Sequence, residues 1–291
     1  MAKSPAHRLG QDIGLILEEA VEGLLRPFAD QHGLYLDRRG ARRARGRRRR
    51  VLWTDMHGND HALDLVLERG GTDERVGDPV AFVETAFRGR TKHSRNKAQE
   101  LQGALQPLGQ TFHQSCPFLG VVLAGVFTDG AITQLASHCL VVVHLPEQTV
   151  VRAFASAGVD VGTVEATETE ELERKAAAVR GLTASERRKV ADQLVDLNRE
   201  RVDAFMGKLK AVVTRHIESV WVLPLRGAAF ESSTVEAAVR FLEGYDDGCA
   251  ADTTPVVRYE VQVRFSNGDR VEGQFARKGE AVGFLQAVCT T

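Results

Sequence analysis

The chain has 291 residues, of which 26% are charged and 43% are hydrophobic, and its formal net charge at pH 7 is -1. This is the composition of an ordinary globular protein with material for one large or two modest domains, and it excludes disordered and fibrous classes. No run of about 18 apolar residues is present, and the first residues lack the apolar core of a signal peptide. We therefore expect a cytoplasmic protein that makes no contact with a membrane.

The four cysteines are widely scattered and form no CxxC pair. Zinc sites and disulfide frameworks both use closely spaced or regularly paired cysteines. We therefore expect neither of them in this chain.

The first predicted elements are a helix followed by extended segments. Residues 11–29 carry apolar side chains at helical spacing, and 34–36 and 51–53 are typical of short strands. Between those strands lies the run RRGARRARGRRRR, in which nine of thirteen residues are arginine and none is acidic.

Such a run repels itself unless anions lie near it, so we expect a mobile arm that contacts the phosphates of DNA. A competing interpretation is a nuclear-localisation or solubilising segment. The predicted DNA-binding residues share a guanidinium group and lie in this run or just after the second acidic strand: Arg42, Arg43, Arg45, Arg47, Arg48, Arg49, Arg50, Arg88 and Arg90.

Two acidic residues lie in apolar segments that follow the arginine run. In HALDLVLE, Asp64 alternates with leucines, which predicts a half-buried strand with Asp64 and Val66 on the face opposite those leucines. In VAFVETAFR, Glu84 has a similar place in the next strand. Each residue alone could be a solvated strand residue, but together with the basic segment RTKHSRNKAQEL they favour a site.

Carboxylates on neighbouring strands can bind Mg²⁺, with Mn²⁺ as a substitute, and such an ion can neutralise a scissile phosphate and activate water. A nearby lysine stabilises the negative charge that develops. We therefore predict Asp64 and Glu84 as metal ligands and catalytic residues, with Lys97 as the first candidate for the lysine and Lys92 as the second.

Further elements follow at regular intervals along the chain. The pattern predicts a helix over 94–105, a strand over 120–128, a helix over 132–138 and a strand over 139–146. The order is therefore helix, three strands, helix, strand, helix, strand.

This order, with one acid on each of two successive strands, resembles the PD-(D/E)XK, or restriction-endonuclease-like, nuclease superfamily over about residues 9–160. The resemblance implies an α/β (α+β) core with a central mixed sheet flanked by helices, and metal-ligand roles for Asp64 and Glu84. It also implies a lysine two residues after the second acid, where this chain has Ala86.

Two explanations of the missing lysine stay open. Lys97 or Lys92 could supply the amine from the following helix, and Arg88 could supply a charge but not a base. Alternatively, catalysis has been lost. Glu18, Glu100 and the nearby histidines are weaker candidates, and Asp55 and Asp60 are expected in solvent-facing turns.

The second half carries no catalytic pattern. One long helix is predicted over 186–213, whose apolar stripe suits either the core or a second subunit. A small α+β module follows, with a strand at 217–225, a helix at 234–243, a hairpin over 259–275 around Asn267-Gly268, and a helix at 280–288. The predicted domains are a nuclease core (1–165), a helical connector (166–216) and the module (217–291).

These features together predict a Mg²⁺-dependent endodeoxyribonuclease, with type II restriction or phage defence as its setting. Double-stranded DNA is the expected partner, and cutting both strands would require a homodimer. No Walker motif or GxGxxG is present, so no nucleotide cofactor is expected. The alternatives are a non-catalytic DNA-binding or assembly component and a repair or structure-specific nuclease.

Overall fold

The computed structural model describes residues 4–90, 94–164, 166–225, 227–246 and 258–289. The chain divides into two compact units, each of which is described by itself. The N-terminal unit comprises Met1–Thr111 and Pro117–Lys210, and the C-terminal unit comprises Phe112–Cys116 and Ala211–Thr291.

A five-stranded mixed sheet forms the centre of the N-terminal unit, with the strand order β1-β4-β5-β6-β7. β1 pairs antiparallel with β4 and β4 antiparallel with β5, whereas β5, β6 and β7 are parallel. The strands are β1 (Leu34–Arg38), β4 (Leu65–Arg69), β5 (Asp78–Arg88), β6 (Phe118–Gly125) and β7 (Val141–Pro146).

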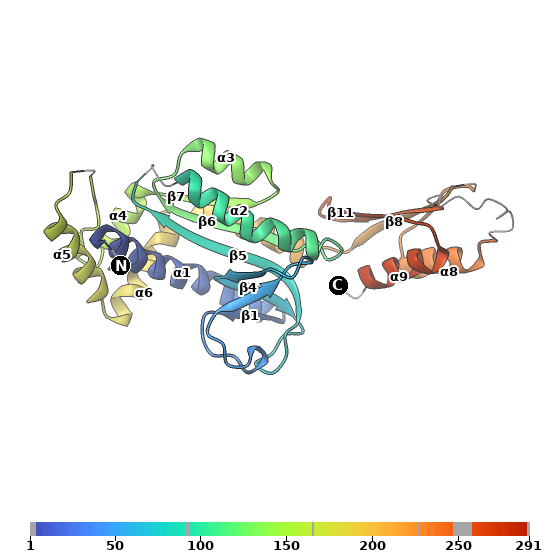
Figure 1. Ribbon diagram of the computed structural model, residues 1–291, viewed down its shortest axis with the longest axis horizontal. Coiled ribbons are helices and arrows are strands. Elements are labelled where there is room, and N and C mark those ends of the chain that lie inside the picture. Colours follow the sequence, from blue (N-terminus) through green and yellow to red (C-terminus); the bar gives the residue numbers. More distant parts are fainter. Residues whose placement is uncertain (1–3, 91–93, 165, 226, 247–257, 290–291) are drawn as a thin grey trace. The chain divides into compact units, whose positions relative to one another are not determined.

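Helices cover both faces of this sheet (Figure 1). α2 and α3 pack together on one face, and α1 lies against the other, where it also contacts α5 and α6. The helices of the unit are α1 (Pro5–Gln31), η1 (Arg43–Arg45), α2 (Ser94–Thr111), α3 (Asp129–Ser137), α4 (Glu147–Ala155), α5 (Thr169–Arg180), α6 (Ala184–Asp196) and α7 (Arg199–Val213).

The helix boundaries follow local sequence signals. Ser4 caps α1 by accepting a hydrogen bond from the His7 backbone N–H, and proline occupies the first turn, where no N–H is required. Thr183 and Glu186 form a reciprocal capping box at the start of α6. In both helices the apolar residues are buried. Together with the strand order described above, these helices confirm the predicted mixed α/β class with a central mixed sheet flanked by helices.

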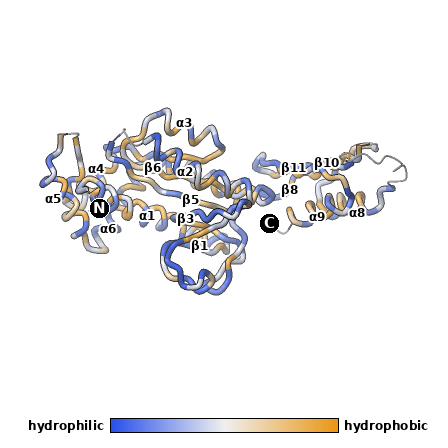
Figure 2. The backbone as a smooth tube through the Cα atoms, viewed as in Figure 1, coloured by the Kyte–Doolittle hydropathy of each residue, from blue (hydrophilic) through white to orange (hydrophobic). Residues whose placement is uncertain are grey.

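A two-stranded ribbon and the arginine-rich loop lie beside the sheet. β2 (Val51–Thr54) pairs antiparallel with β3 (Asp60–Leu63). Figure 2 shows hydrophobic residues along the central strands and hydrophilic residues through the loop between β1 and β2. Asp55 closes the turn of the ribbon by accepting hydrogen bonds from the backbone of His57 and Asn59. Asp55 is buried, so the prediction of a solvent-facing residue there is wrong.

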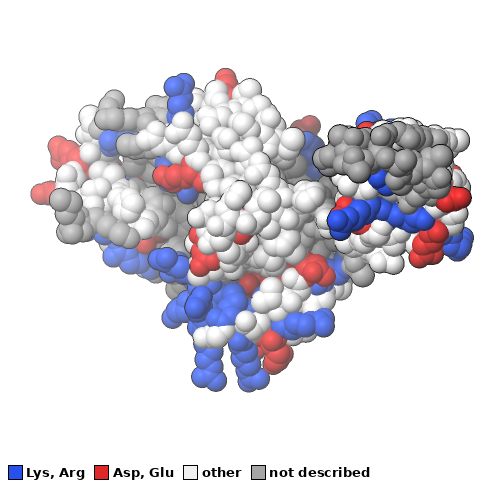
Figure 3. Space-filling view, turned by 45° about the vertical axis from the view of Figure 1, so that its right-hand side comes forward, with Lys and Arg blue, Asp and Glu red and all other residues white. Residues whose placement is uncertain are grey.

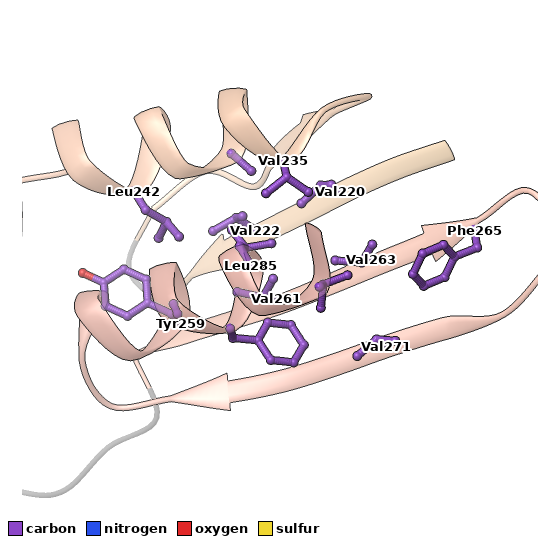
Figure 4. Packing of buried hydrophobic residues seen from close by; sticks show 14 residues of the cluster. Val220, Val222, Val235, Leu242, Tyr259, Val261, Val263, Phe265, Val271 and Leu285 are labelled. Atoms are coloured by element: carbon purple, nitrogen blue, oxygen red, sulfur yellow. The ribbon is translucent and has the colours of Figure 1, made fainter. Parts of the chain in front are cut away.

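The C-terminal unit is a four-stranded antiparallel sheet with two helices. Its strand order is β11-β10-β8-β9. Fourteen buried apolar residues fill the space between the sheet and the helices (Figure 4). The elements are β8 (Ile217–Pro224), β9 (Phe230–Ser232), α8 (Val235–Gly244), β10 (Tyr259–Phe265), β11 (Arg270–Phe275) and α9 (Lys278–Cys289).

This unit is built from two similar halves. Each half contains two antiparallel strands followed by a helix, and each helix carries the pattern Ala-Val-x-Phe-Leu, at 238–242 and at 281–285. The alanine and the leucine of both patterns are fully buried. The same side chains therefore anchor both helices to the sheet.

Two predictions about the second half of the chain are corrected. The helix expected over 186–213 is divided at Leu197 and Asn198 into α6 and α7. Asn198 is buried and its side-chain amide donates to the Leu194 carbonyl and to Thr149 Oγ1, which holds the chain at this break. The connector expected over 166–216 is not a separate part, because α5 and α6 pack on α1 and residues up to Lys210 belong to the N-terminal unit.

None of the helices in the described ranges is long and apolar enough to cross a membrane.

Candidate functional site

Asp64 lies at a bend between β3 and β4 rather than inside a strand. The residues after it do not alternate, since Leu65, Val66 and Leu67 are all fully buried. β4 is an inner strand of a sheet that is covered on both faces, so both of its sides are apolar. The alternating half-buried strand predicted around Asp64 is therefore wrong, and the break in the chain is what sets Asp64 apart.

Glu84 lies within β5, the longest strand of the sheet, and only 7% of it is exposed. It is paired in register with Val121 of β6. A buried carboxylate without compensation is unfavourable. Its surroundings therefore decide whether it is a structural or a functional group.

The two acids predicted from the sequence lie next to each other. The Asp64 backbone N–H donates to Glu84 Oε1 at 3.0 Å. Asp64 Oδ2 in turn accepts hydrogen bonds from the backbone N–H and from the hydroxyl of Thr85, both at 2.8 Å. Thr85, which the sequence analysis did not select, thus holds the Asp64 carboxylate beside Glu84.

Burial and mutual repulsion raise the pKa of two carboxyl groups here. Burial, followed by the charge of Asp64, raises the pKa of Glu84 to about 8. Burial and then Asp64 also raise the pKa of Glu18, on α1, to about 7. Glu18 therefore belongs to the same acidic cluster, which we define as Glu18, Asp64 and Glu84 and call the carboxylate site. Such crowding of carboxylates is typical of functional sites.

Lys97 supplies positive charge to this site from α2. Its charge lowers the pKa of Glu84, against the larger effects that raise it. Ala86, at the expected lysine position, points to the same side of β5 as Glu84 because strand side chains alternate. α2 contacts β5, and its residues Leu101 and Leu105 are buried. Lys97 also forms an ion pair with Glu100 at 3.3 Å.

A groove of about 720 Å³ lies next to this region, although Glu18, Asp64 and Glu84 themselves do not line it. Its walls come from the first turns of α1, the end of β5, the start of α2 and the segment around Val161. Thr85 and Lys97 both line it. A ligand in the groove can therefore reach the lysine and the threonine that binds Asp64.

The other residues that the sequence predicted near the site lie in the groove, outside the described residues or in the ribbon. Arg88 and Arg90 line the same groove, and Arg88 also donates to the Phe87 carbonyl. Lys92, the second choice for the lysine, lies outside the described residues. The His61 ring forms a hydrogen bond with the Asp55 carboxylate in the ribbon.

Arg42 is a structural residue, and its prediction as a DNA-binding residue is wrong. Its side chain is 2% exposed and binds Glu68, which is fully buried, and Asp37 at 2.6 Å and 2.9 Å. It also donates to the carbonyls of Thr72 and Arg75. Burial lowers the pKa of Arg42, but these two carboxylates raise it more strongly, so Arg42 remains charged.

Arg45 has a similar role. It donates to Asp37 and to the backbone carbonyls of Arg38 and Gly40, and its side chain is 8% exposed. Its assignment to DNA binding is therefore also wrong. The reason in both cases is that Asp37 and Glu68, on neighbouring strands, supply the anions that the arginine run itself lacks.

The other arginines of the run are exposed. Arg43 lies near Asp73 and Glu74, while Arg47, Arg48, Arg49 and Arg50 point to solvent. Figure 3 shows basic side chains gathered over this part of the surface. The loop is therefore anchored by buried ion pairs and presents a basic outer surface.

The donor set of the carboxylate site fits a hard divalent cation. Carboxylate oxygens are preferred ligands of Mg²⁺, which usually retains several water ligands. Within the described ranges, no group of three or more His, Cys, Asp or Glu side chains is arranged to hold a metal ion. A cation at this site would have two adjacent carboxylates, Asp64 and Glu84, as protein ligands, and its charge would reduce the repulsion between them.

Comparison with known proteins gives no functional assignment. No family model matches the chain, and no curated protein matches it. A crystal structure of a protein of unknown function, AF1548, aligns with a TM-score of 0.29 and 13% identity, covering 64% of this chain and 99% of that one.

Proposed function

We propose that the chain is a Mg²⁺-dependent DNA endonuclease built on a restriction-endonuclease-like core. The observation that carries the proposal is the pairing of Asp64 with Glu84, with the charge of Lys97 acting on Glu84. A bound Mg²⁺ would neutralise the scissile phosphate and lower the pKa of an attacking water.

The side chains of the site have separate roles in this proposal. Asp64 and Glu84 would be the metal ligands, and Thr85 would fix the Asp64 carboxylate through its two hydrogen bonds. Lys97 would orient water or stabilise the charge that develops on the phosphate, in place of the lysine absent at position 86. The exposed arginines of the loop would bind the DNA backbone.

The setting and the assembly follow from the same proposal. We infer restriction or phage defence, and a homodimer for cutting both strands, by analogy with the fold class. A repair or structure-specific nuclease would use the same chemistry. The DNA substrates that the enzyme prefers would separate these settings.

A non-catalytic DNA-binding component is the second candidate. It is favoured by Ala86, which removes the lysine from its usual strand position. In this case the basic outer surface of the loop would bind DNA, and the carboxylate site would not cut it.

Cleavage of plasmid and phage DNA with Mg²⁺ or EDTA tests the proposal. Wild type should cut only with Mg²⁺, and Asp64→Asn and Glu84→Gln should each reduce cleavage by about 1,000-fold or more because charge at the metal is lost. Asp60→Asn is the matched control, since Asp60 is exposed and precedes Asp64 by four residues.

The Lys97→Met variant tests whether the lysine acts in catalysis or in DNA binding. It should reduce kcat by about 100-fold while leaving DNA binding within about threefold. DNA that stays intact with wild type and Mg²⁺, but is bound with salt-sensitive affinity, would support the non-catalytic alternative.

A further inference from the structure

The end of β1 brings an arginine to the level of Asp64. β1 and β4 are antiparallel, and their last pair is Arg38 with Leu65. Arg39 directly follows this pair on one segment, and Asp64 directly precedes it on the other. The sequence analysis did not include Arg39 among the predicted DNA-binding arginines.

Arg38 and Arg42 form ion pairs with acidic residues, whereas Arg39 does not. Arg38 contacts Glu22 of α1 at 3.2 Å, and Arg42 binds Glu68. Arg39 is exposed, and no hydrogen bond or ion pair with another residue of the described ranges occupies its guanidinium group. Its N–H donors are therefore available to a ligand.

Arg39 also acts on the carboxylate site through its charge. Burial and Asp64 raise the pKa of Glu18, and the positive charge of Arg39 opposes them. In the same way, the positive charge of Lys97 lowers the pKa of Glu84. The acidic cluster is therefore flanked by two cations, Lys97 from α2 and Arg39 from the end of β1.

We propose that Arg39 is the phosphate-binding residue of the carboxylate site and binds a backbone phosphate of the DNA next to the bond that is cut. This inference rests on the proposed nuclease function. The exposed loop would bind the DNA backbone in general, whereas Arg39 would fix the position of one DNA strand relative to Asp64.

The chemistry of the guanidinium group suits this role. It stays charged at all relevant pH values and can donate two parallel hydrogen bonds to a phosphate, but it cannot act as a base. A contact with a phosphate that does not react stabilises the bound substrate and the transition state alike. Its loss should therefore raise KM and leave kcat nearly unchanged.

The experiment compares wild type with Arg39→Gln, Arg39→Lys and the control Arg201→Gln. Arg201 is an exposed arginine of α7, outside the arginine run and outside the carboxylate site. Cleavage of a plasmid is measured with Mg²⁺, and binding of a DNA duplex is measured by fluorescence anisotropy in EDTA over a range of salt concentrations. Thermal unfolding of each variant shows whether it is folded.

We expect Arg39→Gln to raise KM by about 10- to 100-fold, as for loss of a charged hydrogen bond, with kcat within about threefold of wild type. The slope of log K against log salt should fall by about one. Arg39→Lys, which keeps the charge, should recover part of the loss. Arg201→Gln should leave the slope unchanged and change KM by less than about threefold.

Equal cleavage kinetics for Arg39→Gln and Arg201→Gln would overturn the assignment, and so would a salt slope that Arg39→Gln leaves unchanged. If wild type does not cleave, the nuclease proposal fails. The binding data in EDTA still decide in that case, because loss of phosphate contact by Arg39→Gln supports the role of Arg39, and its absence rejects it.

Discussion

The two units of the chain differ in what they bury. The buried polar and charged residues of the described ranges all belong to the N-terminal unit, and they include Glu68, Glu84 and Lys175. The core cluster of the C-terminal unit consists of apolar residues and Tyr259 (Figure 4). Because burying charge is unfavourable, the N-terminal unit must compensate each charged group or use it.

Two of these buried acids show the distinction within one unit. Glu68 is fully buried, but Arg42 and the Gly77 backbone N–H bind its carboxylate, so it is a structural residue. Glu84 has Asp64 and Glu18 as its acidic neighbours, and its pKa is raised. A buried acid beside other acids, rather than beside a matched cation, indicates a functional site.

Removal of Arg42 should have the largest effect on stability. Arg42→Met leaves Glu68 and Asp37 without their cation, and we expect the free energy of unfolding to fall by roughly 3–5 kcal/mol. Urea denaturation measures this change. Arg49→Gln in the same loop should change stability by less than about 0.5 kcal/mol, and equal losses for the two variants would contradict the buried network.

A cavity in the C-terminal unit should have the next largest effect. Leu285 is fully buried, and Leu285→Ala should cost about 3 kcal/mol through lost burial and an unfilled cavity. Hydrogen exchange should show reduced protection in α9, β10 and β8, with little change in β5. Loss of protection in β5 of the same size would show that the two units do not unfold separately.

The stability of the N-terminal unit should depend on pH through Glu84. Its pKa is about 8 in the folded protein and 4.5 ordinarily, so the folded state binds more protons between these values. Stability contributed by the protonated group is therefore present below about pH 4.5 and is lost as the pH rises through about 8. Glu84→Gln should be more stable than wild type by roughly 2–3 kcal/mol at pH 9, and equal to it at pH 4.

Thermal unfolding across this pH range measures the difference. Glu74→Gln, in an exposed loop, is the matched control and should follow the wild type. A Glu84→Gln variant that follows the wild type at every pH would show that Glu84 is not held in an acidic, desolvated site.

The smallest effect is expected on the outer face of the C-terminal sheet. Gln262 of β10 donates to Glu272 of β11 at 2.6 Å on an exposed surface. Glu272→Gln should change stability by less than about 0.5 kcal/mol, because an exposed polar contact exchanges with water. A loss above about 1 kcal/mol in urea denaturation would show that this unit also depends on polar contacts.

The arginine run shows where sequence reasoning reaches its limit. The high density of arginine indicated a basic surface, but the same pattern holds for Arg42, which is buried, and for Arg49, which is exposed. Their roles differ because β1 and β4 place Asp37 and Glu68 beside one of them. These acids are distant from one another along the chain, and no local pattern connects them.

The amino-acid sequence by itself determined most helices and strands, the C-terminal module and the choice of Asp64 and Glu84, because apolar periodicity, turn residues and isolated acids in apolar segments are local signals. Only the tertiary structure decided that Asp64 lies at a strand break, that Glu18 and Thr85 belong to its surroundings and that β1 ends with Arg38 paired to Leu65, the residue after Asp64. Strand register and helix packing bring these residues together, and both depend on contacts between distant parts of the chain.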